Sequence, residues 1–232
     1  MKTLVIIPSR LSASRLPGKP LLKINGTSMI SHVFKKAEKA NIGEVIVATE
    51  DQEIIDDVKK NGGRAILTKK QHKTGTDRIY KALRKLHTKN IDIEMKLQGD
   101  EPLMNIEDIK NLNNQMQKNQ SQLGTLASKI KDRKLFENQN IVKVMTKEKL
   151  NNTNFPEAIN FMRKIFNQGE NIYHHLGIYC YQKETLQNFV SFNQSSNELK
   201  NKLEQLRALD NSIKINVALA ISSPIGVDTK ED

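Results

Sequence analysis

The first hundred residues alternate short apolar runs with longer amphipathic segments. The apolar runs are rich in β-branched residues, too short for helices and flanked by turn residues, so they predict buried strands at residues 4–7, 45–48, 65–67 and 93–97. Between them, apolar residues recur at helical spacing over residues 29–37 and 54–58, and a glycine pair at 62–63 ends the second pattern. This alternation predicts an α/β fold with a mainly parallel central sheet flanked by helices, whose ligands bind beyond the carboxyl ends of the strands.

The later half alternates less regularly. Its apolar runs predict strands at residues 123–127, 141–145, 172–181 and 215–220, and leucines at helical spacing predict one helix over residues 198–209. We therefore expect a mixed sheet in this half. The asparagine-rich residues 151–171 are typical of a loop or mobile flap, and we expect residues 1–232 to form a single domain.

The chain is basic, with 37 Lys and Arg against 26 Asp and Glu and a formal net charge of +11. This charge favours partners that carry phosphate or carboxylate groups. Aromatic residues make up only 5% and tryptophan is absent, so few side chains could stack on bases, and we expect no nucleic-acid partner. A non-catalytic basic protein that binds nucleic acid remains the alternative from another class.

The lone cysteine, Cys180, lies in an apolar run and cannot form an internal disulfide, which fits a buried side chain in a reducing compartment. The apolar run at residues 4–7 is too short for the core of a signal peptide, and no run approaches membrane-spanning length. We expect a cytoplasmic protein without membrane insertion.

A basic loop follows the first predicted strand. Residues 8–20 combine Arg10, Arg15 and Lys19 with Gly18 and small hydroxyl residues. Glycine lets backbone N–H groups approach phosphate oxygens, arginine grips two oxygens at once, and lysine acts as a compact charge, so the loop predicts a triphosphate site. Pro20 stands where a P-loop requires Ser or Thr, which disfavours a Walker-type kinase or ATPase. The alternative is a solvated basic turn.

Two aspartates follow apolar runs and glycines. Asp100 comes after the strand predicted at 93–97, and Asp228 follows Gly226. A nucleoside triphosphate needs its charge neutralised as pyrophosphate leaves, and magnesium held by one or two carboxylates supplies this. Together with the basic loop, the two aspartates predict a magnesium site, although either alone is more often a helix cap or turn former.

With these motifs in view, the chain resembles the 3-deoxy-manno-octulosonate cytidylyltransferase (CMP-Kdo synthetase) family over nearly its whole length. The matching stretches occur in order at residues 6–10 (Ile-Ile-Pro-Ser-Arg), 15–21 (Arg-Leu-Pro-Gly-Lys-Pro-Leu), 47–49 (Val-Ala-Thr), 74–78 (Thr-Gly-Thr-Asp-Arg), 98–102 (Gln-Gly-Asp-Glu-Pro), 175–179 (His-Leu-Gly-Ile-Tyr), 203–207 (Leu-Glu-Gln-Leu-Arg) and 226–229 (Gly-Val-Asp-Thr). The first stretches are shared in part with CMP-sialic acid synthetases and other sugar nucleotidyltransferases. The stretches at 175–179 and 203–207 narrow the resemblance to Kdo.

The resemblance implies a Rossmann-like nucleotidyltransferase domain that transfers CMP from CTP to the anomeric hydroxyl of Kdo, releasing pyrophosphate, in lipopolysaccharide biosynthesis. It implies two magnesium ions and a homodimer, with the sugar-binding and dimerisation region within about residues 123–215. The nucleotide-binding residues would be Pro8, Ser9, Arg10, Arg15, Lys19, Thr74, Arg78, Gln98 and Gly99. The sugar-binding residues would be Gln98, Arg163, His175, Tyr179, Glu204 and Gln205. The catalytic residues would be Arg15, Lys19, Asp100 and Asp228, of which the two aspartates would hold the metal.

The chain departs from the family pattern at several positions. The segment around Arg163 reads Phe-Met-Arg where the family has Phe-Ser-Arg, and Glu50 stands where an aspartate is usual. The sequence given ends at Asp232, where relatives continue into a helix, so we expect altered packing beside Asp228. A cytidylyltransferase for another acidic sugar, such as 8-amino-Kdo or a nonulosonate, is the closest alternative.

Overall fold

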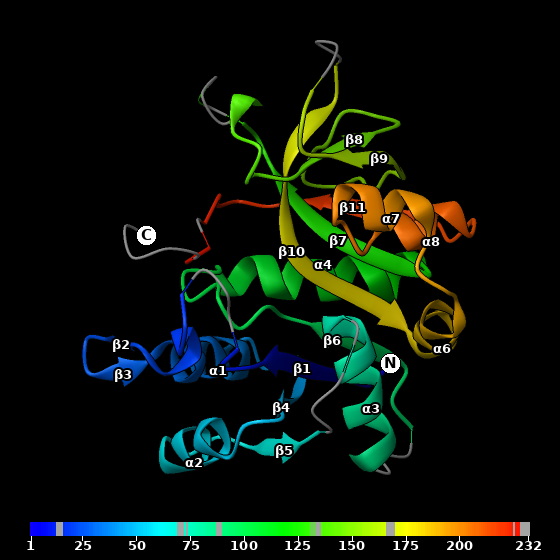
Figure 1. Cartoon of the computed structure of the whole chain (residues 1–232). Coiled ribbons are helices and arrows are strands. Elements are labelled where there is room, and N and C mark those ends of the chain that lie inside the picture. Colours follow the sequence, from blue (N-terminus) through cyan, green and yellow to red (C-terminus); the bar gives the residue numbers. More distant parts are fainter. Residues whose placement is uncertain are drawn as a thin grey trace. The chain divides into compact units, whose positions relative to one another are not determined.

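The computed structural model describes residues 1–12, 16–68, 72, 74–86, 90–130, 132, 136–165, 170–224 and 226–227. The chain forms two compact units, residues 1–110 with 224–232 and residues 111–223 (Figure 1). The region predicted to bind sugar and to dimerise, residues 123–215, lies within the second unit. The single domain expected over residues 1–232 stays a prediction.

The first unit contains a parallel sheet. Its strands are β1 (Thr3–Ser9), β4 (Gly43–Thr49), β5 (Ala65–Leu67) and β6 (Ile93–Lys96), paired in the order β6–β1–β4–β5 with every pair parallel (Figure 1). The four strands predicted in this half are confirmed, with ends that differ by at most two residues. Because β1 and β4 are in register from their first residue to their last, their carboxyl ends lie side by side at Ser9 and Thr49.

Three helices accompany this sheet, α1 (Met29–Lys39), α2 (Gln52–Lys60) and α3 (Gly75–Leu86). The predicted apolar stripes are confirmed, because the residues that formed them are buried: Met29, Ile30, Val33, Phe34 and Ala37 on α1, and Ile54, Ile55 and Val58 on α2. Helices α1 and α2 pack against each other and against β4, while α3 packs against β1 and β4. After α2 the chain turns at Gly62, whose φ of 84° is accessible to glycine at no steric cost.

A short hairpin follows the basic loop. The 3₁₀ helix η1 (Lys19–Leu21) leads into β2 (Lys23–Ile24) and β3 (Thr27–Ser28), which are antiparallel. Asn25 and Gly26, with φ values of 49° and 79°, form the two-residue connection, as the Asn-Gly pair favours. The hairpin returns the chain to Ser28, which caps α1 by accepting a hydrogen bond from the Ser31 N–H.

The second unit contains a mixed sheet, as predicted. Its strands are β7 (Leu123–Ser128), β8 (Lys143–Thr146), β9 (Ala158–Met162), β10 (Ile172–Gln182) and β11 (Ile215–Leu219). Strands β11 and β7 are parallel, whereas the pairs β7–β10, β10–β8 and β8–β9 are antiparallel. The helices α6 (Lys183–Ser191), α7 (Ser196–Asn201) and α8 (Leu206–Asp210) belong to this unit, and α4 (Ile106–Asn119) contains the boundary residue 110. No helix in the described part of the chain is long and apolar enough to span a membrane.

The prediction of a loop or flap over residues 151–171 is wrong for its central part. Strand β9 lies there and pairs with β8. Ala158 and Phe161 are buried, but Ile159 and Asn160 between them are exposed, so the segment lacks the strict alternation that identifies a strand in sequence. Residues 166–169 of the predicted flap lie outside the described residues.

The single helix predicted over residues 198–209 is also wrong. Two short helices, α7 and α8, replace it, because Lys202 adopts a left-handed conformation with φ 54° at the end of α7. Leu199, which completed the predicted stripe, is 58% exposed. The break leaves residues 203–205 outside either helix, and two of these are the predicted sugar residues Glu204 and Gln205.

Candidate active site

The predicted nucleotide-binding residues Pro8, Ser9 and Arg10 lie at the carboxyl end of β1. Ser9 is 7% exposed, and its hydroxyl finds no hydrogen-bond partner among the described residues, although a buried hydroxyl is normally satisfied. Arg10 is exposed. The end of this strand therefore presents one buried hydroxyl and one cation to a ligand.

Hydrogen bonds hold the described residues of the basic loop before and after positions 13–15. The Leu11 N–H donates to the Asp51 carboxylate at 2.7 Å, and the Gly18 N–H donates to the Leu11 carbonyl at 3.2 Å. Gly18 has a φ of 70°, so glycine allows the close return of the chain. Arg15, predicted to hold the triphosphate, lies outside the described residues.

Lys19 and Asp100, which are 81 positions apart in the chain, meet in the first unit. The Lys19 Nζ donates to Asp100 Oδ2 at 2.8 Å and to the Val227 carbonyl at 2.8 Å. The Val227 N–H in turn donates to the Asp100 carbonyl at 3.0 Å. The structure thus brings together two predicted catalytic residues and the residue that precedes Asp228. Asp228 itself lies outside the described residues.

Two of the predicted nucleotide-binding residues, Thr74 and Arg78, lie at the start of α3. The Thr74 N–H and hydroxyl donate to Asp77 at 3.0 and 2.9 Å, which fixes the first turn of the helix. Arg78 is 4% exposed and donates to Glu50 at 2.9 Å and to the Thr68 hydroxyl at 3.0 Å. Glu50, the residue that differs from the family pattern, therefore still pairs with the predicted arginine.

Gly99 lies against the end of β1. A Cβ at this position would stand 3.2 Å from the Pro8 carbonyl oxygen and 3.2 Å from Ile30 Cδ1, closer than ordinary contact. Gln98, predicted to border both nucleotide and sugar, is partly buried beside it. Glycine at position 99 keeps the surface between the ends of β1 and β6 free of a side chain.

The donor set around Asp100 fits a divalent cation. Magnesium prefers carboxylate oxygens, and the Asp100 side chain is 29% exposed and already faces a cationic group, the Lys19 ammonium. Among the described residues no group of three or more His, Cys, Asp or Glu side chains is placed to hold a metal. Asp100 therefore offers one carboxylate that would suit magnesium, which proteins commonly bind through one or two carboxylates together with substrate phosphates.

The predicted sugar residues Arg163, His175, Tyr179, Glu204 and Gln205 all lie in the second unit. Arg163 follows β9, and its guanidinium donates to backbone carbonyls of two segments: Gln139 at 3.1 Å, Asn140 at 3.4 Å, Asn201 at 3.2 Å and Lys202 at 3.4 Å. Two of these carbonyls stand at the end of α7, just before Glu204. Arg163 therefore links the end of β9 to the segment that carries the predicted sugar residues Glu204 and Gln205.

His175 and Tyr179 lie together on β10. Their ring centroids are 5.4 Å apart, and the His175 ring also meets Phe161 edge-on at 5.0 Å. His175 is 7% and Tyr179 6% exposed, so both rings are held by packing. The role of these side chains in sugar binding stays a prediction.

A buried ion pair supports the segment with Glu204 and Gln205. Arg207 Nε and Nη2 donate to the two carboxylate oxygens of Glu198 at 2.7 and 2.6 Å, and the Arg207 guanidinium carbon lies 4.7 Å from the centre of the Phe189 ring. Glu198 also completes a capping box with Ser195 at the start of α7. Sequence analysis missed this pair, although the Ser-x-x-Glu pattern from Ser195 signals the helix start.

Two basic side chains of the second unit, Lys143 and His174, have pKa values below their ordinary ones. Burial, and then the positive charge of Arg163, lowers the pKa of Lys143, whose ammonium donates to the carbonyls of Asn138 and Arg163. Burial, and then the charge of Lys143, lowers the pKa of His174, which lies opposite Lys143 across the β8–β10 pair. These shifts mark a region of the second unit where cations are crowded and desolvated.

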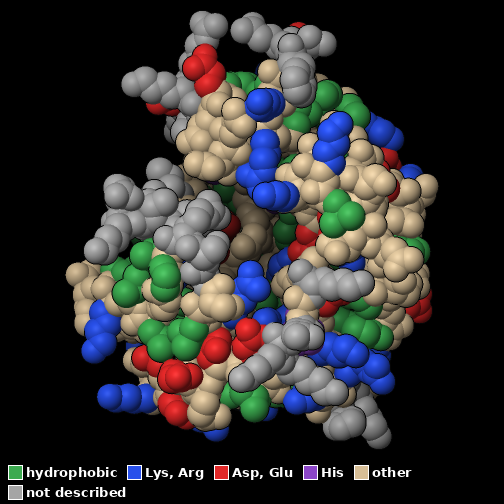
Figure 2. Space-filling model, in the orientation of Figure 1, with side chains coloured by type: hydrophobic (Ala, Val, Ile, Leu, Met, Phe, Trp, Pro, Cys, Tyr) green, Lys and Arg blue, Asp and Glu red, His purple; other side chains and the backbone are tan. Residues whose placement is uncertain are grey.

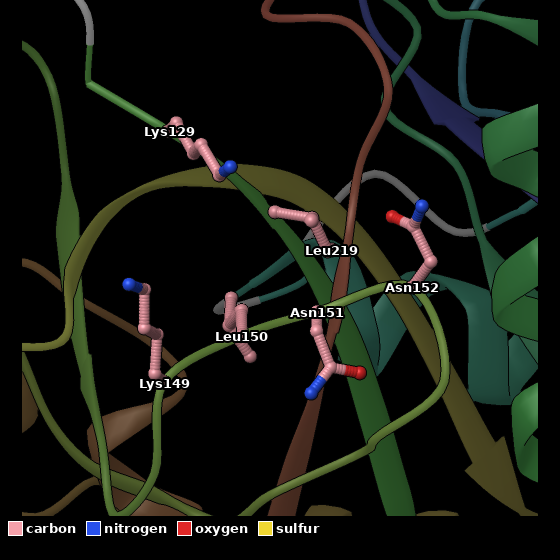
Figure 3. Close-up of a pocket in the computed structure, with 6 residues that line it drawn as sticks. All are labelled: Lys129, Lys149, Leu150, Asn151, Asn152 and Leu219. Atoms are coloured by element: carbon pink, nitrogen blue, oxygen red, sulfur yellow. The ribbon is translucent and has the colours of Figure 1, made fainter.

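The second unit also has a pocket of about 310 Å³. Its lining residues come from the ends of β7 and β11 and from the segment after β8: Lys129, Lys149, Leu150, Asn151, Asn152 and Leu219 (Figure 3). None of the predicted site residues is among them. On the face of the molecule shown in Figure 2, lysine and arginine side chains lie intermixed with acidic ones.

The fold and these residues together define a nucleotide-transferring protein. A sequence model of the family described as "Cytidylyltransferase" matches residues 4–215. The chain is similar in structure to UDP-glucose pyrophosphorylase complexed with UDP-glucose, with a TM-score of 0.72 over 100% of this chain and 95% of the other at 14% identity. That likeness concerns the fold alone and agrees with the predicted α/β fold, in which helices flank a mainly parallel sheet.

Relatives of higher sequence identity identify the family within this class. The chain is 41% identical to a 3-deoxy-manno-octulosonate cytidylyltransferase of Rhodopseudomonas palustris (strain BisB18), over 100% of this chain and 94% of the relative. It is 40% identical to the protein of that name from Nitrobacter winogradskyi, over 100% and 91%. A solved structure of CMP:2-keto-3-deoxy-manno-octonic acid synthetase complexed with CTP matches with a TM-score of 0.89 at 34% identity, over 100% and 95% of the two chains. The chain belongs to the 3-deoxy-manno-octulosonate cytidylyltransferase family and is a nucleotidyltransferase.

Proposed function

We propose that this enzyme transfers CMP from CTP to the anomeric hydroxyl of Kdo. The observation that carries the proposal is the meeting of Lys19, Asp100 and Val227, which joins the basic loop to the carboxylate predicted to hold magnesium. The identity to relatives of that name over the whole chain supports the same substrates. In the reaction, a bond forms between the sugar oxygen and the α-phosphorus of CTP, the bond to the leaving pyrophosphate breaks, and the hydroxyl loses its proton.

The predicted site residues of the first unit then have defined roles. Lys19 binds phosphate oxygens as a compact charge, and the Ser9 hydroxyl, which is buried and unpartnered, donates to a phosphate oxygen. Gly99 lets the segment that carries Asp100 pack closely against Pro8 and Ile30, which positions Asp100 next to the end of β1. Asp100 and Asp228 would hold magnesium, which supplies charge neutralisation on the phosphates and lowers the pKa of the attacking hydroxyl.

The Lys19–Asp100 ion pair suggests how the charges of the site are compensated before substrate binds. The Lys19 ammonium compensates the Asp100 carboxylate at 2.8 Å, so neither charge is left uncompensated in a partly buried place. Substrate supplies phosphates to the lysine and a metal to the carboxylate. The two charges can then exchange partners without either being desolvated alone.

The direct test is a pyrophosphate-release assay with each of the four nucleoside triphosphates, with and without Kdo. We expect release only with CTP, Kdo and magnesium together. Asp100→Asn keeps the shape of the side chain but removes its charge, and we expect kcat to fall at least about 100-fold, as for other groups that stabilise charge in a transition state. Asp92→Asn is the matched control, because Asp92 is exposed and, within the described residues, accepts from the Lys2 N–H. Turnover of the Asp100 variant near that of the control would remove Asp100 from the mechanism.

The same assay separates the alternatives. Faster CMP transfer to 8-amino-Kdo or to a nonulosonate than to Kdo would change the sugar and leave the chemistry as proposed. Binding of nucleic acid that weakens steeply with salt, without turnover of any nucleotide, would favour a non-catalytic basic protein.

We also propose a cytoplasmic homodimer. Strand β9 pairs on one side with β8, and it exposes Ile159, which is 51% accessible, at the edge of the second unit's sheet. An edge strand presents backbone groups that can pair with another chain, so we place the interface at this edge. Ile159→Lys should therefore convert a dimer to a monomer in sedimentation velocity; a variant that sediments like the wild type would place the interface elsewhere.

A further inference from the structure

The basic loop begins where two parallel strands end side by side. Strands β1 and β4 are in register up to Ser9 and Thr49, and beyond them the chain continues into the basic loop after β1 and towards α2 after β4. Past these strand ends Leu11 and Asp51 meet, because the Leu11 N–H donates to Asp51 Oδ2 at 2.7 Å. A side-chain carboxylate thus accepts from the loop where the pairing of the two strands has already ended.

Asp51 binds the loop in place of its own helix. It stands at the N-cap of α2, where an aspartate normally accepts from an N–H of the first turn, yet its side chain makes no such bond to this helix, all of whose residues are described. The Asp51 N–H donates to the hydroxyl of the fully buried Thr49 at 3.1 Å, and the Asp51 carbonyl accepts from the Ile55 N–H at 3.4 Å. Hydrogen bonds therefore fix the backbone of Asp51 and hold its carboxylate at the base of the loop.

Leu11 joins the beginning of the basic loop to its end. The Leu11 N–H is bound to Asp51, and the Leu11 carbonyl accepts from the Gly18 N–H at 3.2 Å. Two cations of the loop, Arg10 and Lys19, are the sequence neighbours of Leu11 and Gly18. The position of Leu11 therefore constrains the separation of these two cations, and binding one triphosphate with both of them requires a defined separation.

A carboxylate near a phosphate site needs a physical reason, because like charges repel. Asp51 precedes the first turn of α2, where the helix dipole is positive and favours an anion. A hydrogen bond to a charged acceptor is also about twice as strong as one between neutral groups. Aspartate therefore holds the loop more firmly than a neutral side chain would, while the helix compensates part of its charge.

We propose that Asp51 is a positioning residue for CTP, whose carboxylate holds Leu11 so that the basic loop is preformed for the triphosphate. This inference rests on the proposed function of the basic loop as the phosphate site. Asp51 acts through Leu11 and does not touch the nucleotide. Loss of the carboxylate then weakens CTP binding and leaves binding of the sugar unchanged.

The kinetic test removes the carboxylate and then restores an acceptor. For Asp51→Ala we expect the KM for CTP to rise about tenfold, the effect of losing one hydrogen bond to a charged group, with the KM for Kdo within about twofold of the wild type. Asp51→Asn keeps an acceptor oxygen, and we expect a rise of only about threefold. A KM for CTP that is unchanged or lower in Asp51→Ala would overturn the proposal, because the carboxylate would then contribute nothing to CTP binding or would oppose it.

Glu53→Ala is the matched control for the charge at the start of α2. Glu53 lies in the first turn of the same helix and is exposed. Its removal changes the charge at this helix terminus but leaves the bond from the Leu11 N–H to Asp51 in place. We expect the KM for CTP to stay within about twofold of the wild type, as for other surface substitutions. A rise as large as that in Asp51→Ala would attribute both effects to the helix charge, and the proposal would fail.

Amide hydrogen exchange, followed by NMR, tests the contact without turnover. In the enzyme without substrates we expect the Leu11 N–H to exchange at least about tenfold more slowly than an unstructured amide, and about tenfold faster in Asp51→Ala than in the wild type. Exchange at the unstructured rate in the wild type would overturn the proposal even if Asp51→Ala failed to fold. A wild type that releases no pyrophosphate from CTP and Kdo would instead refute the proposed function, while the exchange rates would still show whether Asp51 holds the loop.

Discussion

The buried ion pair of the second unit allows a quantitative prediction for stability. Arg207→Met removes the guanidinium that donates to both carboxylate oxygens of Glu198, at 2.6 and 2.7 Å. The Arg207 and Glu198 side chains are only 2% and 4% exposed, so water cannot replace the lost partner. Glu198 would retain hydrogen bonds from the Ser195 N–H and from Gln194 but would lose its counter-charge.

The magnitude follows from this burial. Removing one member of a buried pair costs about 3–5 kcal/mol, because the remaining charge is left desolvated. The loss of the guanidinium over the Phe189 ring adds about 0.5–2 kcal/mol. For a protein of this size each kcal/mol lowers Tm by about 2–4 °C, so we expect a fall of roughly 7–28 °C.

Thermal melts followed by circular dichroism, with urea unfolding as a second measure, would test the prediction. The double variant Arg207→Met with Glu198→Leu removes both charges and should recover much of the loss. Lys110→Met is the control, because Lys110 pairs with Glu107 on the surface, at 39% and 63% exposure, and should cost less than about 1 kcal/mol. If Arg207→Met melts within about 2 °C of the wild type, the pair is not desolvated in solution and the reasoning fails.

Three further variants test other parts of the structure. Gly99→Ala puts a methyl group 3.2 Å from the Pro8 carbonyl oxygen, and we expect weaker CTP binding by calorimetry, with a stability cost of about 1–3 kcal/mol; unchanged affinity would contradict the close approach. Ser28→Ala removes the oxygen that accepts from the Ser31 N–H and should cost about 1 kcal/mol in urea unfolding; no loss would mean that the cap is not formed. Burial and Lys143 lower the pKa of His174 in the folded state, so the unfolded chain binds the proton more readily and stability should fall as pH drops below about 6.5. Melts between pH 8 and 5 should show a shallower fall for His174→Asn, and equal slopes would refute the assignment.

The spacing of apolar residues along the chain was enough to predict the fold of the first unit. Strands β1, β4 and β6 are largely buried on both faces and the helices bury one stripe each, so the apolar runs of β1 and β4 and the spacing of Ile54, Ile55 and Val58 carry most of the signal. In the second unit the signal weakens, because β9 is an edge strand with its central residues exposed, and Lys202 breaks a continuous leucine pattern through its left-handed conformation. A hydrophobic pattern does not show that a strand lies at the edge of a sheet, and it does not show that a lysine has a positive φ.

For the candidate site, motifs identified residues but not their partners. The order of the motifs could not show that the Lys19 ammonium meets both Asp100 and the Val227 carbonyl, because these groups are far apart along the chain. Nor could it show that Arg163 donates to four backbone carbonyls. Such contacts depend on tertiary folding. The motif shows only which positions carry a cation and which carry a carboxylate.

Burial distinguishes the ion pair of the proposed catalytic site, Lys19–Asp100, from the pair Glu198–Arg207 of the second unit. The side chains of Glu198 and Arg207 are almost inaccessible, so the pair cannot exchange partners and serves the fold around residues 203–205. Lys19 and Asp100 are 12% and 29% exposed, which lets phosphate and metal reach them while the lysine still compensates the carboxylate. Because solvent screens the partly exposed Lys19–Asp100 pair more than the buried one, Asp100→Asn should affect turnover more than Tm, and Arg207→Met should do the reverse. This opposite ranking in two simple measurements separates the catalytic pair from the structural one.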